Sequence, residues 1–312
     1  MFGIVQFPHG GVEFPCNDDN WLDREKGMTK WNAGPHCRRL VKHQGMYVDK
    51  KGSSGSSELA FWTEWEANTL VSELPLLNRT DRTVARWVHT VVWPDPDYAK
   101  PEWTCRHSKQ NQLRAQCSST LLNGGTNTDP CVFGTTFKYC LCRQEKASHI
   151  LKHLDEGALI VFGSTIDGVF YLDTVFVVNK RQEYETTPGS LDGLDVSAEY
   201  RNLTMNRFVG FEGAFYRGAT ISEKVMDMYS FTPAMLLPGK DQSFRRRCAL
   251  NVDEINKLNC ERQMFNPSNT QSVKFTQVAN RPGLVKDVWE KIRQQVLDQG
   301  FVLGTCFDWP KK

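Results

Sequence analysis

Four widespread motifs of phosphate-binding, zinc-binding and hydrolytic enzymes are missing from this chain. None of its 312 residues falls in a GxxxxGK(S/T), GxGxxG, HExxH or GxSxG pattern. Those patterns are typical of P-loop hydrolases, Rossmann dehydrogenases, common zinc proteases and α/β-hydrolases. Their absence argues against these four classes of enzyme.

Long apolar runs and an excess of one charge are missing as well. No stretch approaches about 18 uninterrupted apolar residues, the length that indicates a membrane-spanning helix. The first residues, MFGIVQFPHGG, lack the basic start and the long apolar centre of a secretory signal peptide. The net charge of +2 is too small to argue for bulk binding of nucleic acid, although it permits a local basic patch. We therefore expect a cytoplasmic chain with no membrane partner.

The cysteines do not form a recognisable framework. Ten are scattered along the chain, and no CxxC pair occurs, so we expect reduced, buried thiols. One set resembles zinc ligands, because two thiols at i and i+2 share a strand face and two histidines at i and i+4 share a helix face. The set is Cys140, Cys142, His149 and His153. CxC is an unusual zinc half-site, and residues 143–155 read as an ordinary amphipathic helix, so we predict no metal and no cofactor.

The pattern of elements indicates a mixed α+β fold. Strand-like segments rich in β-branched and aromatic residues cover 2–7, 58–67, 83–93 and 131–142. Residues 157–179 predict a hairpin that turns at Asp167-Gly168. A helix followed by this hairpin resembles the barrel-forming core of PUA-like base-binding domains, which implies a similar core here.

A polar, turn-rich stretch at 179–195 is the candidate domain boundary. It predicts a β-rich mixed domain over 1–185, which carries the candidate site, and a smaller α/β part over 186–312. Residues 284–299 carry one apolar stripe and end at Gly300, which predicts a helix. Strand-like segments on both sides of it indicate a β-α-β unit with parallel pairing.

The stretch WNAGPHCRRL, residues 31–40, concentrates recognition chemistry beside a Gly-Pro break. A helix that begins at Pro35 would place His36 and Arg39 near one face and Arg38 on another. A helix N-terminus with arginines beside it is suited to an anion. Trp31 and Asn32 add stacking and hydrogen bonding, so we predict a ligand site. The alternative is a surface helix with solvated arginines.

The stretch FWTEWE, residues 61–66, predicts a strand with two different faces. Alternation puts Trp62, Glu64 and Glu66 on one face. A tryptophan ring stacks on a flat base, and a carboxylate accepts hydrogen bonds from exocyclic amines. A glutamate of raised pKa there could also act as a general acid or base. The alternative is a strand with one face in the core.

A third stretch, FPHGGVEF, places His9 and Glu13 around a Gly-Gly turn, where backbone can approach a ligand closely. The alternative is a plain loop after an edge strand. Together with other segments, it resembles the motif series of an uncharacterised bacterial protein family, with FPHxGxE, WNxGxHxRxL, FWxEWE and DPxVFG motifs over residues 4 to about 235. The resemblance implies an intracellular bacterial protein, and it implies no catalytic residue.

Three functions remain open. The first is binding of a nucleotide or nucleic acid, in which aromatic rings stack a base and an arginine holds phosphate. Its ligand-binding residues would be Trp31, Asn32, Arg38, Arg39, Trp62, His9 and Glu13. The second is an enzyme that acts on a nucleotide phosphate or glycosidic bond, with His36 and either Glu64 or Glu66 as its acid-base pair. The third is a protein-interaction scaffold in which these aromatic residues are core.

Overall fold

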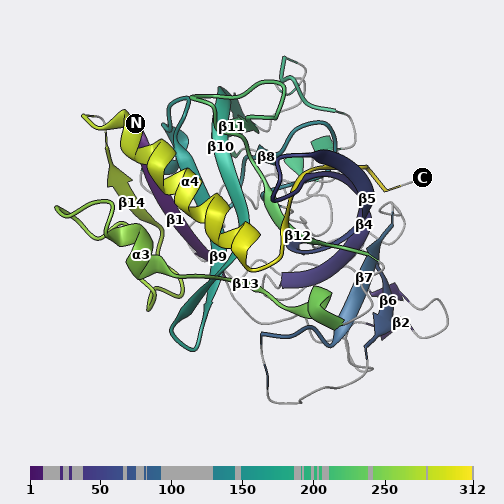
Figure 1. Cartoon of the computed structure of the whole chain (residues 1–312). Helices are drawn as coiled ribbons and strands as arrows, with labels where there is room; N and C mark the ends of the chain where they lie inside the picture. Colours follow the sequence, from purple (N-terminus) through teal and green to yellow (C-terminus); the bar gives the residue numbers. More distant parts are fainter. Residues whose placement is uncertain are drawn as a thin grey trace.

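The computed structural model describes residues 1–9, 22–23, 28–29, 38–65, 69–74, 81, 83–92, 129–144, 149–185, 191, 193–197, 200–201, 204–205, 211–237, 242–278 and 280–310. The chain is β-rich, with two sheets and few helices (Figure 1). Its fold is therefore mixed α+β, as predicted.

The first sheet combines one parallel strand pair with antiparallel neighbours. Its order is β14-β1-β9-β10-β11-β8, and β13 also pairs with β10. Strands β1 and β9 run parallel, while β9 and β10 form the predicted hairpin. The bounds are β1 Gly3–His9, β8 Lys138–Tyr139, β9 Leu159–Ile166, β10 Val169–Glu185, β11 Glu212–Gly218, β13 Cys248–Leu250 and β14 Lys274–Gln277.

The second sheet curls on itself. Its order is β15-β12-β5-β4-β7-β6-β3-β2, and β15 also pairs with β4, so that β15, β12, β5 and β4 form a ring (Figure 1). The bounds are β2 Leu22–Asp23, β3 Met28–Thr29, β4 Arg38–Val48, β5 Ser54–Glu64, β6 Thr69–Glu73, β7 Trp87–Val91, β12 Thr232–Leu236 and β15 Val302–Phe307. Each sheet thus combines strands from before and after residue 185.

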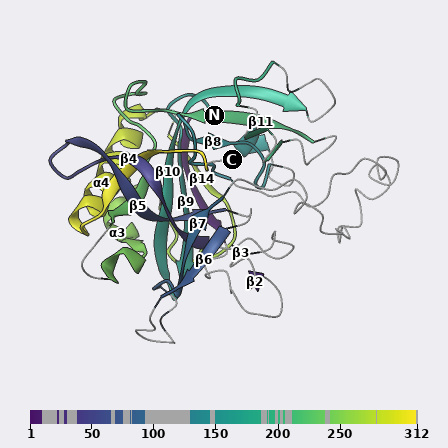
Figure 2. The ribbon, with the colours of Figure 1, turned by 90° about the vertical axis from the view of Figure 1, so that its right-hand side faces the viewer.

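The predicted C-terminal helix is confirmed, but its predicted parallel pairing is wrong. Helix α4, Pro282–Asp298, buries its apolar stripe in a core cluster that also contains residues of β9 and β10. Strand β14 before it pairs with β1, whereas β15 after it pairs antiparallel with β12 and β4. The helix therefore connects two sheets rather than two strands of one sheet. Figure 2 shows it at the same side of the molecule as the short helix α3, Val252–Asn256.

The predicted helix over 143–155 is wrong in its described part, which holds only the 3-10 turn η2, His149–Lys152. Arg143 has a φ of 61°, a left-handed conformation that a right-handed helix does not accommodate. The hairpin that follows is confirmed. Asp167 and Gly168 both have positive φ, as the favoured two-residue hairpin turn requires.

The predicted helix from Pro35 is also wrong in its described part. Residues from Arg38 onward form strand β4, which pairs with β5 along its whole length. Leu40 and Val41 are buried on the two faces of that strand, which gives the residues a sheet period rather than a helix period. Strand β5 confirms the predicted alternation, because Phe61 and Trp65 join one core cluster and Trp62 joins another.

Candidate functional site

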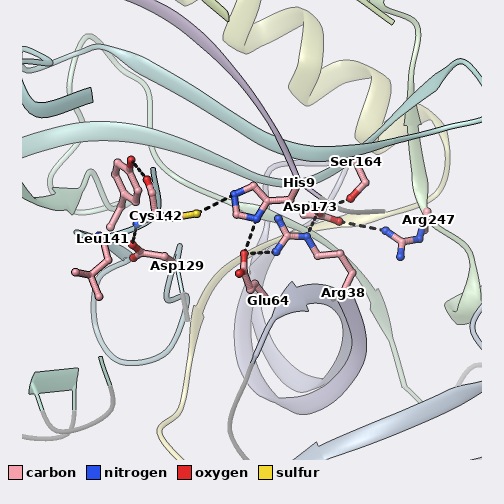
Figure 3. A network of polar contacts seen from close by, with 10 residues as sticks. His9, Arg38, Glu64, Asp129, Leu141, Cys142, Ser164, Asp173 and Arg247 are labelled. Atoms are coloured by element: carbon pink, nitrogen blue, oxygen red, sulfur yellow. Dashed lines mark hydrogen bonds and ion pairs between the residues drawn. The ribbon is translucent and has the colours of Figure 1, made fainter. Parts of the chain in front are cut away.

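A network of buried polar side chains connects the two sheets (Figure 3). Its centre is Glu64, whose Oε2 lies 2.7 Å from Nδ1 of His9 and 2.5 Å from Nη1 of Arg38. The Nε of Arg38 lies 2.7 Å from the Oδ2 of Asp173. All four side chains are at most 3% exposed, so these charges interact in a medium of low dielectric constant.

Strand pairing brings these residues together. Arg38 opens β4 and Glu64 ends β5, and the two residues are direct partners in the antiparallel register. His9 is the last residue of β1, where it pairs with Ser164 of β9. The pairing of β9 and β10 slips between Leu172 and Thr174, which leaves Asp173 in a bulge. Bulges re-aim a side chain, and this one accompanies the contact of Asp173 with Arg38.

His9 joins Glu64 to a thiol. While Nδ1 faces the carboxylate, Nε2 lies 3.3 Å from Sγ of Cys142 (Figure 3). An ionised carboxylate only accepts hydrogen bonds, so we assign the imidazole proton to Nδ1. Nε2 then offers its lone pair to the Cys142 thiol. The three side chains form a line of thiol, imidazole and carboxylate from three separate segments.

The backbone around Cys142 is held by a buried carboxylate. Asp129 accepts the backbone N–H groups of Cys140, Leu141 and Cys142 at distances from 2.5 to 3.2 Å. Burial raises the pKa of Asp129 to about 7, although the three amides act to lower it. The next residue, Arg143, has a left-handed backbone, which costs a non-glycine residue about 1–2 kcal/mol. Strain of this kind is often found beside reactive groups.

A second arm of the network runs from Asp173 to Arg247. The Nη1 of Arg247 lies 3.7 Å from the Oδ1 of Asp173, and its guanidinium lies 3.7 Å from the ring centre of Trp62. Burial raises the pKa of Asp173, and the two arginines partly offset that rise. Burial acts to lower the pKa of Arg38, but Glu64 and Asp173 outweigh it and raise the pKa. Two carboxylates thus face two guanidinium groups.

The predicted site residues occupy different environments from those expected. Trp62 is 4% exposed; it packs with Leu40 and Ala60, and its indole N–H donates to the carbonyl of Arg246. Arg39 is buried and donates to Thr69, which in turn contacts His89. We expected the arginines at an exposed anion site at the start of a helix. The structure places Arg38 and Arg39 in a strand, where both are buried.

Three of the candidate residues lie close together, in a buried network and not on an exposed ligand surface. His9, Arg38 and Glu64 come from the three stretches singled out in the sequence, and they meet in one network. The other candidates, Glu13, Trp31, Asn32, His36 and Glu66, lie outside the described residues. Ligand binding by any of these residues stays a prediction.

Four members of the network were not predicted as site residues: Asp129, Cys142, Asp173 and Arg247. Asp129 entered only through the DPxVFG motif and Cys142 only as a possible zinc ligand. Arg247 belongs to the basic cluster SFRRRC, residues 243–248. In that cluster Arg245 and Arg247 are buried, because they contact the carbonyl of Ala85 and the carboxylate of Asp173. An arginine-rich segment next to a strand was the signal that could have indicated a buried ion-pair network.

Two features are absent from the part of the chain that the structure describes. There, no group of three or more His, Cys, Asp or Glu side chains is arranged to hold a metal ion. The six cysteines described carry free thiols. No helix among these residues is both long and apolar enough to cross a bilayer.

No known protein provides a guide to this site. The chain matches no family model, and no curated protein or solved structure is significantly similar to it.

Proposed function

We propose that this protein is an enzyme that transfers a group through Cys142, with His9 as general base and Glu64 as the residue that orients His9. The observation that carries the proposal is the line from Sγ to Nε2 at 3.3 Å and from Nδ1 to the carboxylate at 2.7 Å. A nucleophile beside a base that a third group orients is the recurring arrangement for covalent catalysis.

In the proposed step, His9 accepts the thiol proton and then passes it to the leaving group. The Cys142 thiol proton moves to Nε2 while Sγ bonds to the electrophilic atom of the substrate. The bond to the leaving group breaks, and the leaving group takes the proton from Nε2. Water then releases the group from sulfur, with His9 acting as base again. Glu64 stabilises the imidazolium that forms in each half of the reaction.

Burial makes the base necessary. It raises the pKa of the Cys142 thiol well above its usual range, as does the charge of Glu64, while Arg143 and Arg38 act to lower the pKa. The resting sulfur is therefore a neutral thiol, and it needs His9 to become a nucleophile. His9 and Cys142 are 4% and 6% exposed, so water is largely excluded from the charges that form.

For the substrate we propose a nucleotide or nucleic acid, at its phosphate or glycosidic bond, in the cytoplasm. Support comes from the sequence, where Trp31, Asn32 and Glu13 combine stacking and hydrogen-bonding groups. The hairpin of β9 and β10 is the part of the expected PUA-like pattern that the described residues contain, whereas the helix expected before it is not. A panel of nucleosides, nucleotides and short oligonucleotides is accordingly the first to be assayed.

The proposal is tested by the alkylation rate of each cysteine, measured with iodoacetamide and peptide mass spectrometry on the folded protein. We expect Cys142 to react faster than its neighbour Cys140, which donates no proton to a histidine and contacts Tyr200. His9→Asn should slow alkylation of Cys142 by about 100-fold, the lower range for general-base catalysis. The matched control is His153→Asn, because His153 is exposed and remote from the network.

Two results would overturn the proposal. One is a Cys142 that reacts no faster than Cys140 in a protein whose circular dichroism is native. The other is an equal loss of rate in the His9 and His153 variants. Cys142→Ser should abolish turnover of any substrate that the panel identifies, and Cys140→Ser should not.

A further inference from the structure

Among the described residues, Arg143 has no acidic partner, in contrast to Arg38 and Arg247. Arg38 and Arg247 are buried and face the carboxylates of Glu64 and Asp173. The Arg143 guanidinium instead donates to the carbonyl of Gln271, and among the described residues no carboxylate lies within ion-pair distance of it. None of the described residues therefore neutralises its positive charge.

This charge lies beside the proposed catalytic line. Arg143 directly follows Cys142, and its guanidinium carbon lies 5.8 Å from the ring centre of Phe7. Phe7 also packs against His9, with ring centres 4.7 Å apart. Phe7 is fully buried, so the three side chains form a packed series from the partly exposed Arg143 into the site.

The backbone indicates that an arginine side chain has a use at this position. A φ of 61° would suit glycine or asparagine without the cost that arginine carries. Contacts with the carbonyl of Gln271 and the ring of Phe7 hold the side chain, and neither contact neutralises its positive charge. A partly exposed cation next to a nucleophile is suited to an anionic group of a substrate.

We infer that Arg143 binds an anionic group of the substrate, a phosphate or a carboxylate, and so positions the substrate against Cys142. The inference rests on the proposed role of Cys142 as nucleophile. The sequence suggested Arg39 as the residue that holds phosphate. We assign that contact to Arg143 instead, because Arg39 is buried in the sheet and donates to Thr69. The site would thus select anionic over neutral substrates of the same reactivity.

The test compares two probes of one mechanism and different charge, iodoacetate and iodoacetamide. In both reactions the sulfur–carbon bond forms, the carbon–iodine bond breaks, iodide leaves with the electron pair, and His9 takes the thiol proton. The measured quantity is the ratio of the iodoacetate rate to the iodoacetamide rate at Cys142. Arg143→Gln should lower this ratio by about tenfold, the lower range for a hydrogen bond to a charged group.

Two controls separate charge from folding. Arg143→Lys keeps the charge and should retain most of the ratio. Arg262→Gln removes an exposed arginine elsewhere and should leave the ratio unchanged. Competition with inorganic phosphate and with acetate, at equal ionic strength, then shows which anion protects Cys142 from iodoacetate.

A second measurement keeps the inference separate from the proposed function. Inorganic phosphate should raise the melting temperature of the wild-type protein and of Arg262→Gln, and should raise that of Arg143→Gln much less. If Cys142 reacts with both probes but Arg143→Gln leaves the ratio and the phosphate effect unchanged, the inference is wrong and the proposed function stands. If Cys142 reacts with neither probe while the phosphate effect depends on Arg143, the proposed function is wrong and an anion site remains.

Discussion

Replacement of Glu64 by glutamine is the sharpest test of the buried network. The carboxylate oxygen Oε2 receives both His9 and Arg38, at 2.7 and 2.5 Å, and the side chain has no exposed surface. Glutamine keeps the shape and loses the charge. Arg38 and Arg247 then face the single carboxylate of Asp173, so one buried positive charge loses its balance.

The expected loss of stability follows from that imbalance. Breaking a buried ion pair by removing one partner costs about 3–5 kcal/mol. With an unfolding entropy of about 2.1 cal/mol/K per residue, a chain of 312 residues loses about 1.5 °C of melting temperature per kcal/mol. Glu64→Gln should therefore melt about 5–8 °C below wild type.

Scanning calorimetry of the wild type and four variants checks this number: Glu64→Gln, Arg38→Met, the double variant and a control. The matched control is Glu58→Gln, on the same strand β5 but exposed, which should change stability by less than about 0.5 kcal/mol. In the double variant Glu64→Gln with Arg38→Met, both charges are gone, and the loss should be smaller than the sum of the two single losses by about 0.5–3 kcal/mol. The ion-pair account is refuted if Glu64→Gln has the same melting temperature as Glu58→Gln. It is also refuted if the stability loss of the double variant equals the sum of the losses of Glu64→Gln and Arg38→Met.

Three further predictions concern other parts of the structure. Trp62→Ala should lower the free energy of unfolding, measured with urea, by about 3–5 kcal/mol, because Trp62 is buried under Arg247. A decrease below about 1 kcal/mol would mean that the ring faces solvent. Burial raises the pKa of Asp129 from its usual 3.8 to about 7, so between these pH values the folded protein holds a proton that the unfolded chain has lost. Stability from this group should thus fall as pH rises from about 4 to about 7, and Asp129→Asn should flatten the fall in urea midpoints; an unchanged slope would contradict this. Thiol titration of protein denatured without reductant should find close to ten free thiols, and several protected pairs would contradict the reduced state.

Local patterns in the sequence were sufficient for several elements. The stripe at 284–299 and the Asp167-Gly168 turn each predicted an element that the structure contains. Alternation in FWTEWE predicted the two faces of β5. These predictions succeeded because helix and strand periods and turn chemistry depend on neighbours within a few residues.

Other elements followed tertiary contacts against their local signal. The Gly-Pro break and arginines at 34–39 suggested a helix, yet Arg38 and Arg39 lie in β4, since pairing with β5 and burial of both faces outweigh a local preference for helix. Arg143 interrupts a segment whose apolar spacing is helical. Its backbone is left-handed, and its side chain contacts Phe7 and Gln271, which are remote in the sequence.

By itself the sequence determined that the chain is β-rich, where its longest helix lies, and which three short stretches concentrate polar and aromatic groups. Only the tertiary structure decided the partners. His9 and Cys142 are separated by 133 positions, and the bulge that accompanies the Asp173–Arg38 contact exists only in the pairing of β9 with β10. The physical reason is that a charge can be buried only where distant strands supply its counter-charge, and no local period encodes which strands will meet.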